Sequence, residues 1–271
     1  MTYRKKCIIV FLLLLISSIS IYIFYNNRVY SETDALVYNS KGVVLLREGN
    51  SKEALALFNK AIHTRTPQME FYFNKGLALG ILGKYKEEID AYNEALTLST
   101  KDPRIFIKIF INKASALYAL KKYKESLEYC EMILKVTKKN PMVYNGTGAA
   151  LGALNRFDEA IDNYNKAIAL NPDYYEPHAN KACPLYNLGR YEEAIETCNK
   201  AIALDPKYHG INQIYAIKAK ALNKLERHEE AIESANKALE LNPQDPVAMQ
   251  AKEYAEAKMK ERLQVKNIKN T

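Results

Sequence analysis

Two stretches of the sequence are near copies of each other. Residues 156–173 read RFDEAIDNYNKAIALNPD, and residues 190–207 read RYEEAIETCNKAIALDPK. They lie 34 residues apart and are identical at 11 of 18 positions. In both stretches apolar residues recur three and four positions apart, which predicts an amphipathic helix that ends at Pro172 or Pro206. Copies at such a spacing indicate a repeated structural unit.

The same pattern occurs six times, and each copy can be followed from one small residue, which we call the marker. Leucine always stands three positions after the marker, and a mostly aromatic position follows at nine. Each copy predicts two amphipathic helices joined by a short turn. Because no copy can bury its apolar face alone, the copies must stack on one another. The markers are Gly42, Gly76, Ala114, Gly148, Ala182 and Ala219.

This set of positions resembles the tetratricopeptide repeat, whose 34-residue period holds at three of the five joints. The resemblance covers residues 35–245. It implies an all-α fold, a right-handed superhelical solenoid of about six helix-turn-helix units with a C-terminal capping helix. The expected units are 35–68, 69–106, 107–140, 141–174, 175–211 and 212–245, followed by a capping helix at 246–265 and a frayed tail at 266–271.

The first 31 residues differ from the repeats. Three basic residues at 4–6 precede an apolar run, residues 7–25, which would span about 28 Å as a helix, close to the ~30 Å hydrocarbon core of a bilayer. We therefore expect a signal-anchor with a cytoplasmic N-terminus, which would place the repeats on the outer (periplasmic or extracytoplasmic) side of a single-pass membrane protein. Two alternatives remain: a cleaved signal ending near residues 29–31, which gives a secreted protein, and a buried helix.

Charge and motifs argue against nucleic-acid binding and catalysis. The net charge is +8, but after residue 31 the chain carries 35 basic and 31 acidic side chains, interspersed as on a solvated surface. The four cysteines form no CxxC pair, and no Cys/His cluster has zinc-ligand spacing. Glycine-rich phosphate loops, paired-carboxylate motifs and HExxH are also missing from the sequence. We therefore expect that the protein is not an enzyme and that it has no cofactor, no metal site and no nucleic-acid partner.

The resemblance implies binding of a peptide or helix of a partner protein in a concave groove lined by the first helix of each unit. Transferred from the family's groove positions, the predicted binding residues are Phe73, Leu77, Lys108, Ile111, Ser115, Tyr118, Asn145, Tyr186 and Lys220. The middle of this groove is apolar, so the expected ligand is an apolar or aromatic segment. The clamp that some family members use for the carboxylate of chaperones is excluded, because only Asn74 and Lys108 match its five positions.

These expectations make the protein a scaffold or adaptor at the cell envelope. A secreted effector and a non-catalytic regulatory subunit of an envelope enzyme are the alternatives.

One residue departs from the repeat: Glu88 stands where four of the other copies have alanine and one has serine. A carboxylate there must bend outward or lose its hydration, so we expect Glu88→Ala to be neutral or stabilising.

Overall fold

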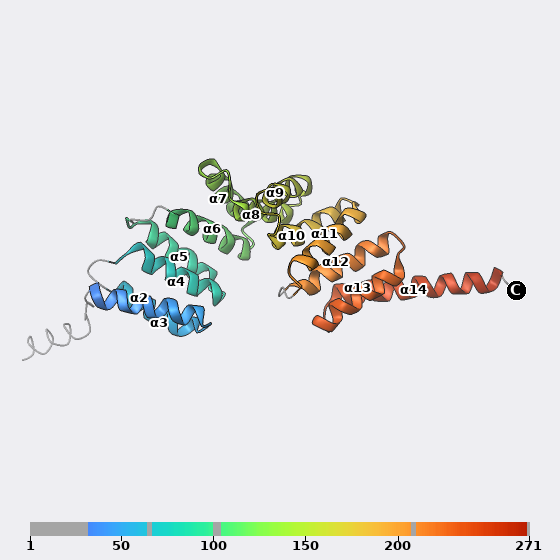
Figure 1. The fold of residues 1–271 in the computed structure, drawn as a ribbon, viewed down its shortest axis with the longest axis horizontal. Coiled ribbons are helices and arrows are strands. Elements are labelled where there is room, and N and C mark those ends of the chain that lie inside the picture. The colour runs from blue at the N-terminus through green and yellow to red at the C-terminus, as the bar shows by residue number, and fades with distance from the viewer. Residues whose placement is uncertain (1–31, 64–66, 100–103, 207–209, 270–271) are drawn as a thin grey trace, which may run out of the picture. The chain divides into compact units, whose positions relative to one another are not determined.

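The structure is a computed structural model that describes residues 32–63, 67–99, 104–206 and 210–269. The described part consists of helices and their connections, with no strand (Figure 1). The chain divides into two compact units, Met1–Phe106 (unit 1) and Ile107–Thr271 (unit 2). Each unit consists of consecutive helix pairs, the packing of a tetratricopeptide solenoid, so the predicted fold class is confirmed.

Unit 1 contains two antiparallel helix pairs. The first pairs α2 (Glu32–Arg47) with α3 (Ser51–Ile62), and the second pairs α4 (Met69–Ile81) with α5 (Tyr85–Leu96). Helix α4 also packs on α3, which joins the pairs into one stack. The buried side chains include Phe58, Phe71 and Tyr92, so large aromatic residues fill the space between helices in this unit.

Unit 2 continues the same arrangement and ends in a longer helix. Its core lies between consecutive helices and includes Leu151, Leu185 and Leu222, the leucines three positions after their markers. The last helix reaches Lys269, beyond residue 265, where the sequence predicts its end. The helices are α6 (Arg104–Ala119, which begins just before the unit boundary), α7 (Tyr123–Val136), α8 (Pro141–Ala153), α9 (Phe157–Leu170), α10 (Tyr175–Asn187), α11 (Tyr191–Leu204), α12 (Ile211–Lys224), α13 (His228–Leu241) and α14 (Pro246–Lys269).

The marker residues are small because a side chain of the second helix lies directly on them. A Cβ atom added to Gly148 would lie 2.7 Å from Cε1 of Tyr164, and one added to Gly42 would lie 2.6 Å from Cε1 of Phe58. The residue 16 positions after each glycine marker is an aromatic residue. Where the marker is alanine, that residue is instead Cys130, Cys198 or Ala235. The two positions are therefore complementary in size: the largest side chains stand opposite the residue that has none.

The turn inside each helix pair needs a left-handed residue, seven positions after the marker. Three of these residues are glycines, and the others are Lys121, Asn155 and Glu226, with φ of 60°, 60° and 58°. The backbone closes each turn as a helix C-cap, for example through Lys122 N–H, which donates to the carbonyl of Leu117 at 2.9 Å. A lysine or glutamate in this conformation is strained relative to glycine.

Glu88 does not bend outward. Its side chain is buried at the start of α5, where its carboxylate oxygens lie against Gly80 of α4. Burial raises the pKa of Glu88 to about 7, and a hydrogen bond with Tyr92 only partly offsets this. Of the two outcomes expected from the sequence, the structure thus selects the loss of hydration.

The predicted single-pass membrane topology is corrected by the structure. Among the residues that it describes, no helix is both long and apolar enough to cross a bilayer. Helix α8 carries no charge but has 13 residues, whereas a spanning helix needs about 20. The predicted signal-anchor, residues 1–31, lies outside the described residues, and so does the cleavage site of the alternative secreted form.

Candidate functional site

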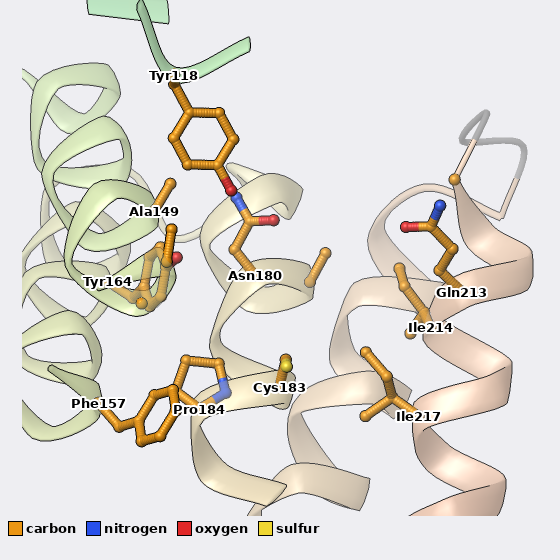
Figure 2. Close-up of a pocket in the computed structure, with 14 residues that line it drawn as sticks. Tyr118, Ala149, Phe157, Tyr164, Asn180, Cys183, Pro184, Gln213, Ile214 and Ile217 are labelled. Atoms are coloured by element: carbon orange, nitrogen blue, oxygen red, sulfur yellow. The ribbon is translucent and has the colours of Figure 1, made fainter. Parts of the chain in front are cut away.

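Three hollows lie along the first helices of unit 2. The central hollow has a volume of about 370 Å³ and is walled by α6, α8, α9, α10 and α12 together with Gly210 before α12 (Figure 2). Most of its walls thus come from the first helices of successive pairs, the helices on which the sequence places the binding residues. Its lining residues are Tyr118, Ala149, Gly152, Ala153, Phe157, Tyr164, Ala179, Asn180, Cys183, Pro184, Gly210, Gln213, Ile214 and Ile217.

Tyr118 is the most prominent side chain of the central hollow. Figure 2 shows its ring extending from α6 toward Asn180 of α10. Tyr118 is 40% exposed, and its ring packs against that of Tyr123, with the two ring centroids 5.2 Å apart. Burial, with smaller contributions from Tyr123 and Cys183, raises the pKa of Tyr118. The phenol therefore stays neutral and offers an aromatic face together with one hydroxyl group.

The opposite wall of the central hollow is aliphatic. Ile214 and Ile217 project from α12, and the thiol of Cys183 faces them from α10 (Figure 2). The base is formed in part by Tyr164, which is buried, and whose pKa is raised by that burial. An apolar side chain entering this hollow would lose water on several sides at once, which is the main source of affinity in such sites.

A smaller leading hollow, of about 160 Å³, lies between α6, α7 and α8. It shares Tyr118 and Ala149 with the central hollow, so the two are continuous. Ile111 lies in its apolar wall and packs on the buried cluster of Ala114 and Cys130. Ser115 is exposed, and its hydroxyl donates to the Ile111 carbonyl at 3.1 Å.

Hydrogen bonds of asparagine side chains link α8 to α10 and to the residue before it. Asn180 Nδ2 donates to Asn145 Oδ1 at 3.1 Å, and Asn145 Nδ2 donates to the Tyr174 hydroxyl at 3.4 Å. Asn180 is exposed and retains unused hydrogen-bonding capacity, because a primary amide has two N–H donors and an acceptor oxygen. These amides can therefore bind the backbone of an extended peptide.

A terminal hollow, of about 230 Å³, lies between α10, α12 and the last helix α14. Lys220 Nζ lies 4.5 Å from the ring centroid of Tyr186, a cation–π contact across α12 and α10. The lining residues are Tyr186, Lys220, Asn223, Lys224, Gln250, Ala251 and Tyr254.

The structure brings six of the nine predicted binding residues into these hollows. Ile111, Ser115, Tyr118 and Asn145 line the leading hollow, and Tyr186 and Lys220 line the terminal one.

The other three predicted residues are not brought into these hollows. Lys108 is exposed on α6, and lines none of the three. Phe73 and Leu77 belong to unit 1, where the ring of Phe73 is half-buried with its centroid 6.1 Å from that of Tyr92.

Sequence reasoning missed several lining residues. Asn180 and Ile217 stand two positions before their markers, so including that position would have found them. Gln250 and Tyr254 come from α14, which is outside the repeat, so no repeat position could have been transferred to them.

The three cysteines that the structure describes are of two kinds. Cys130 and Cys198 are buried, and burial raises their pKa values to about 11 and about 12. Cys183 is exposed in the central hollow, where the side-chain amide of Asn187 donates to its sulfur at 3.4 Å. Within the described residues no group of three or more His, Cys, Asp or Glu side chains could hold a metal ion.

Comparison with known proteins agrees with the repeat fold. Family models described as tetratricopeptide repeat match residues 34–103, 141–174, 176–208 and 213–245. The uncharacterized protein MJ0572 of Methanocaldococcus jannaschii is 39% identical over 61 residues, which make up 22% of this chain and 71% of that protein.

Solved structures with a similar fold include a chain of the APC/C hetero-tetramer Cut9–Hcn1. It has a TM-score of 0.72 and 17% identity, over 82% of this chain and 43% of that chain, so the match spans less than half of that chain. PilF of Pseudomonas aeruginosa has a TM-score of 0.65 and 15% identity, over 80% and 96% of the two chains. YrrB, described as a TPR protein with an unusual peptide-binding site, has a TM-score of 0.50 and 21% identity, over 65% and 88%. At these identities the likeness shows the fold alone.

Proposed function

Because this chain belongs to the tetratricopeptide repeat family, we propose that it is a non-catalytic scaffold whose unit 2 binds a peptide segment of a partner protein. The segment lies across the central and leading hollows, which Tyr118 joins. The observation that carries this proposal is the central hollow itself, a cavity of about 370 Å³ at the face where the first helices of successive pairs meet.

The composition of the hollow indicates the chemistry of the ligand. Tyr118, Ile214 and Ile217 offer apolar surface, and a cavity of this volume holds about one or two side chains. An apolar or aromatic anchor of the peptide fits there, and anchors of this kind carry most of the energy of an interface. The exposed amides of Asn180 and Gln213 are placed to bind the peptide backbone beside that anchor.

The proposal can be tested with a library of random 12-residue peptides displayed on phage and selected on the purified chain. Synthetic copies of the selected peptides are then titrated by fluorescence polarisation. Tyr118→Ala should weaken binding by about thirtyfold, the effect of losing roughly 2 kcal/mol from one aromatic anchor.

Cys183 provides a second, covalent test of the same site. In a Cys7→Ser chain, N-ethylmaleimide should modify Cys183 in preference to the buried Cys130 and Cys198. The adduct occupies the central hollow and should weaken peptide binding by at least tenfold. The matched control is Cys183→Ser with Lys124→Cys, which carries the adduct at an exposed position on α7. The proposal is wrong if selected peptides bind both modified proteins as tightly as the unmodified chain.

A further inference from the structure

The terminal hollow differs from the other two hollows in its charge. Lys220 and Lys224 both line it from α12, one helical turn apart, and its other lining residues carry no formal charge. Lys220 lies over the ring of Tyr186. Burial raises the pKa of Tyr186, and the positive charge of the nearby Lys224 partly offsets this. Two ammonium groups are thus directed at one small hollow.

Within the described residues these two lysines have no carboxylate partner, unlike the arginines that precede the second helices of unit 2. Arg156, Arg190 and Arg227 each pair with a glutamate three residues later, with N–O distances of 2.6 Å. In the part of the chain that the structure describes, neither Lys220 nor Lys224 has a carboxylate within ion-pair distance. Like charges at positions i and i+4 of a helix destabilise it. An anion between them would turn this repulsion into attraction.

The walls of the terminal hollow are held in place by hydrogen bonds. Asn223 Nδ2 donates to the carbonyl of Ala251 at 2.7 Å and so ties α12 to α14. Its Oδ1 is then the acceptor, so His228 Nδ1 donates to it at 3.1 Å. The His228 ring in turn contacts Tyr254, with centroids 6.1 Å apart. A preformed site of this kind loses little entropy when it binds a ligand.

The terminal hollow also continues the surface of the central hollow. On α10, Tyr186 follows Cys183 by three residues, and on α12 Lys220 follows Ile217 by three. Three residues of helix advance by about 4.5 Å and return to nearly the same face. One peptide can therefore place an apolar side chain in the central hollow and a neighbouring side chain in the terminal one.

We infer that the terminal hollow binds an aspartate or glutamate side chain of the partner peptide, between Lys220 and Lys224 and beside the rings of Tyr186 and Tyr254. This inference rests on the proposed function and adds the ligand's chemistry to it: an apolar anchor followed or preceded by an acidic residue. The carboxylate accepts charge-assisted hydrogen bonds from two ammonium groups, while the tyrosine rings cover its methylene groups.

The same phage library tests this inference, with three proteins selected in parallel. They are the wild-type chain, Lys220→Gln/Lys224→Gln, and Lys124→Gln/Lys135→Gln. The last pair removes the same charge from exposed positions on α7, so it controls for net charge. Peptides from the wild type and the control should be enriched in Asp and Glu relative to those from the Lys220/Lys224 variant.

Synthetic peptides then identify the group that is bound. Replacing the enriched Glu by Gln, or Asp by Asn, should weaken binding to the wild type by about tenfold and have little effect on the Lys220/Lys224 variant. Amidation of the peptide C-terminus should change nothing. The inference is overturned if both lysine variants lose affinity equally, if the Gln and Asn peptides bind as tightly as the acidic ones, or if only amidation weakens binding.

The two proposals can fail separately in these experiments. If the library yields no binding peptide, both are overturned. If the Cys183 adduct blocks binding while the Lys220/Lys224 variant selects the same peptides as the wild type, the proposed function stands and the acidic subsite is wrong.

Discussion

Gly148→Ala should destabilise unit 2, whereas Gly152→Ala in the same helix should stabilise it. Both changes replace glycine inside α8, so both gain about 1 kcal/mol in helix propensity. They differ in the space available. The new Cβ at position 148 would lie 2.7–3.0 Å from three ring atoms of Tyr164, whereas at position 152 its nearest neighbour would be 3.8 Å away.

The expected difference follows from these distances. Moving the Tyr164 ring inside a packed pair costs about 1–3 kcal/mol, the usual range for an added methyl group in a full core. Gly148→Ala should therefore have a free energy of unfolding roughly 1–3 kcal/mol below that of Gly152→Ala. Repeat proteins need not unfold in one step, so urea midpoints should be accompanied by amide hydrogen exchange in α8 and α9.

A double-mutant cycle tests the size complementarity directly. Gly148→Ala with Tyr164→Cys reproduces the pairs Ala114/Cys130 and Ala182/Cys198 that other helix pairs of this chain use. Tyr164→Cys alone leaves a cavity and should cost about 3–5 kcal/mol. In the double variant the added methyl group no longer meets the ring, so its penalty should disappear and the two changes should couple favourably by about 1–3 kcal/mol. Additive effects, or equal midpoints for the two alanine variants, would refute this account of the marker position.

Three further predictions concern stability and the groove. Glu88→Gln should stabilise unit 1 at pH 8, on the order of 1 kcal/mol after solvent screening. The raised pKa of Glu88 means that the folded wild type loses stability as pH rises from about 4.5 to about 7. The stabilisation by Glu88→Gln should therefore be nearly gone at pH 5, and equal stabilisation at pH 5 and pH 8 would contradict this account. Lys121→Gly should raise the urea midpoint, equivalent to about 0.5–1 kcal/mol in stability, because glycine adopts the left-handed backbone without strain; a lower midpoint would refute this. Glu226→Gly should raise the midpoint by less, because it also removes the exposed ion pair with Arg262, whose N–O distance is 2.7 Å. Tyr118→Ala should change thermal melting much less than Leu117→Ala, whose buried side chain is worth about 2–5 kcal/mol; similar melting would place Tyr118 in the core.

The helix pairs and their order follow from the sequence, because they depend on local patterns. Apolar residues at helical spacing, small markers and leucines at +3 recur at intervals that specify each helix pair without reference to distant contacts. The residues that line the hollows were also largely predictable, since Ile111, Tyr118, Asn145 and Tyr186 lie on first helices whose orientation the repeat dictates. The lining residues from α14 were not predictable, because that helix is outside the repeat.

Two features could be decided only by the tertiary structure. The pairing of glycine markers with aromatic residues, and of alanine markers with cysteine or alanine, depends on the contact between two helices, which neither helix shows alone. The fate of Glu88 depends on the space beside Gly80, where the carboxylate stays buried. The sequence by itself determined which helices form and which faces are apolar, since both depend on periodicity along the chain. The tertiary structure decided which side chains meet across those faces, because packing volume and dielectric surroundings are set by neighbours far away in sequence.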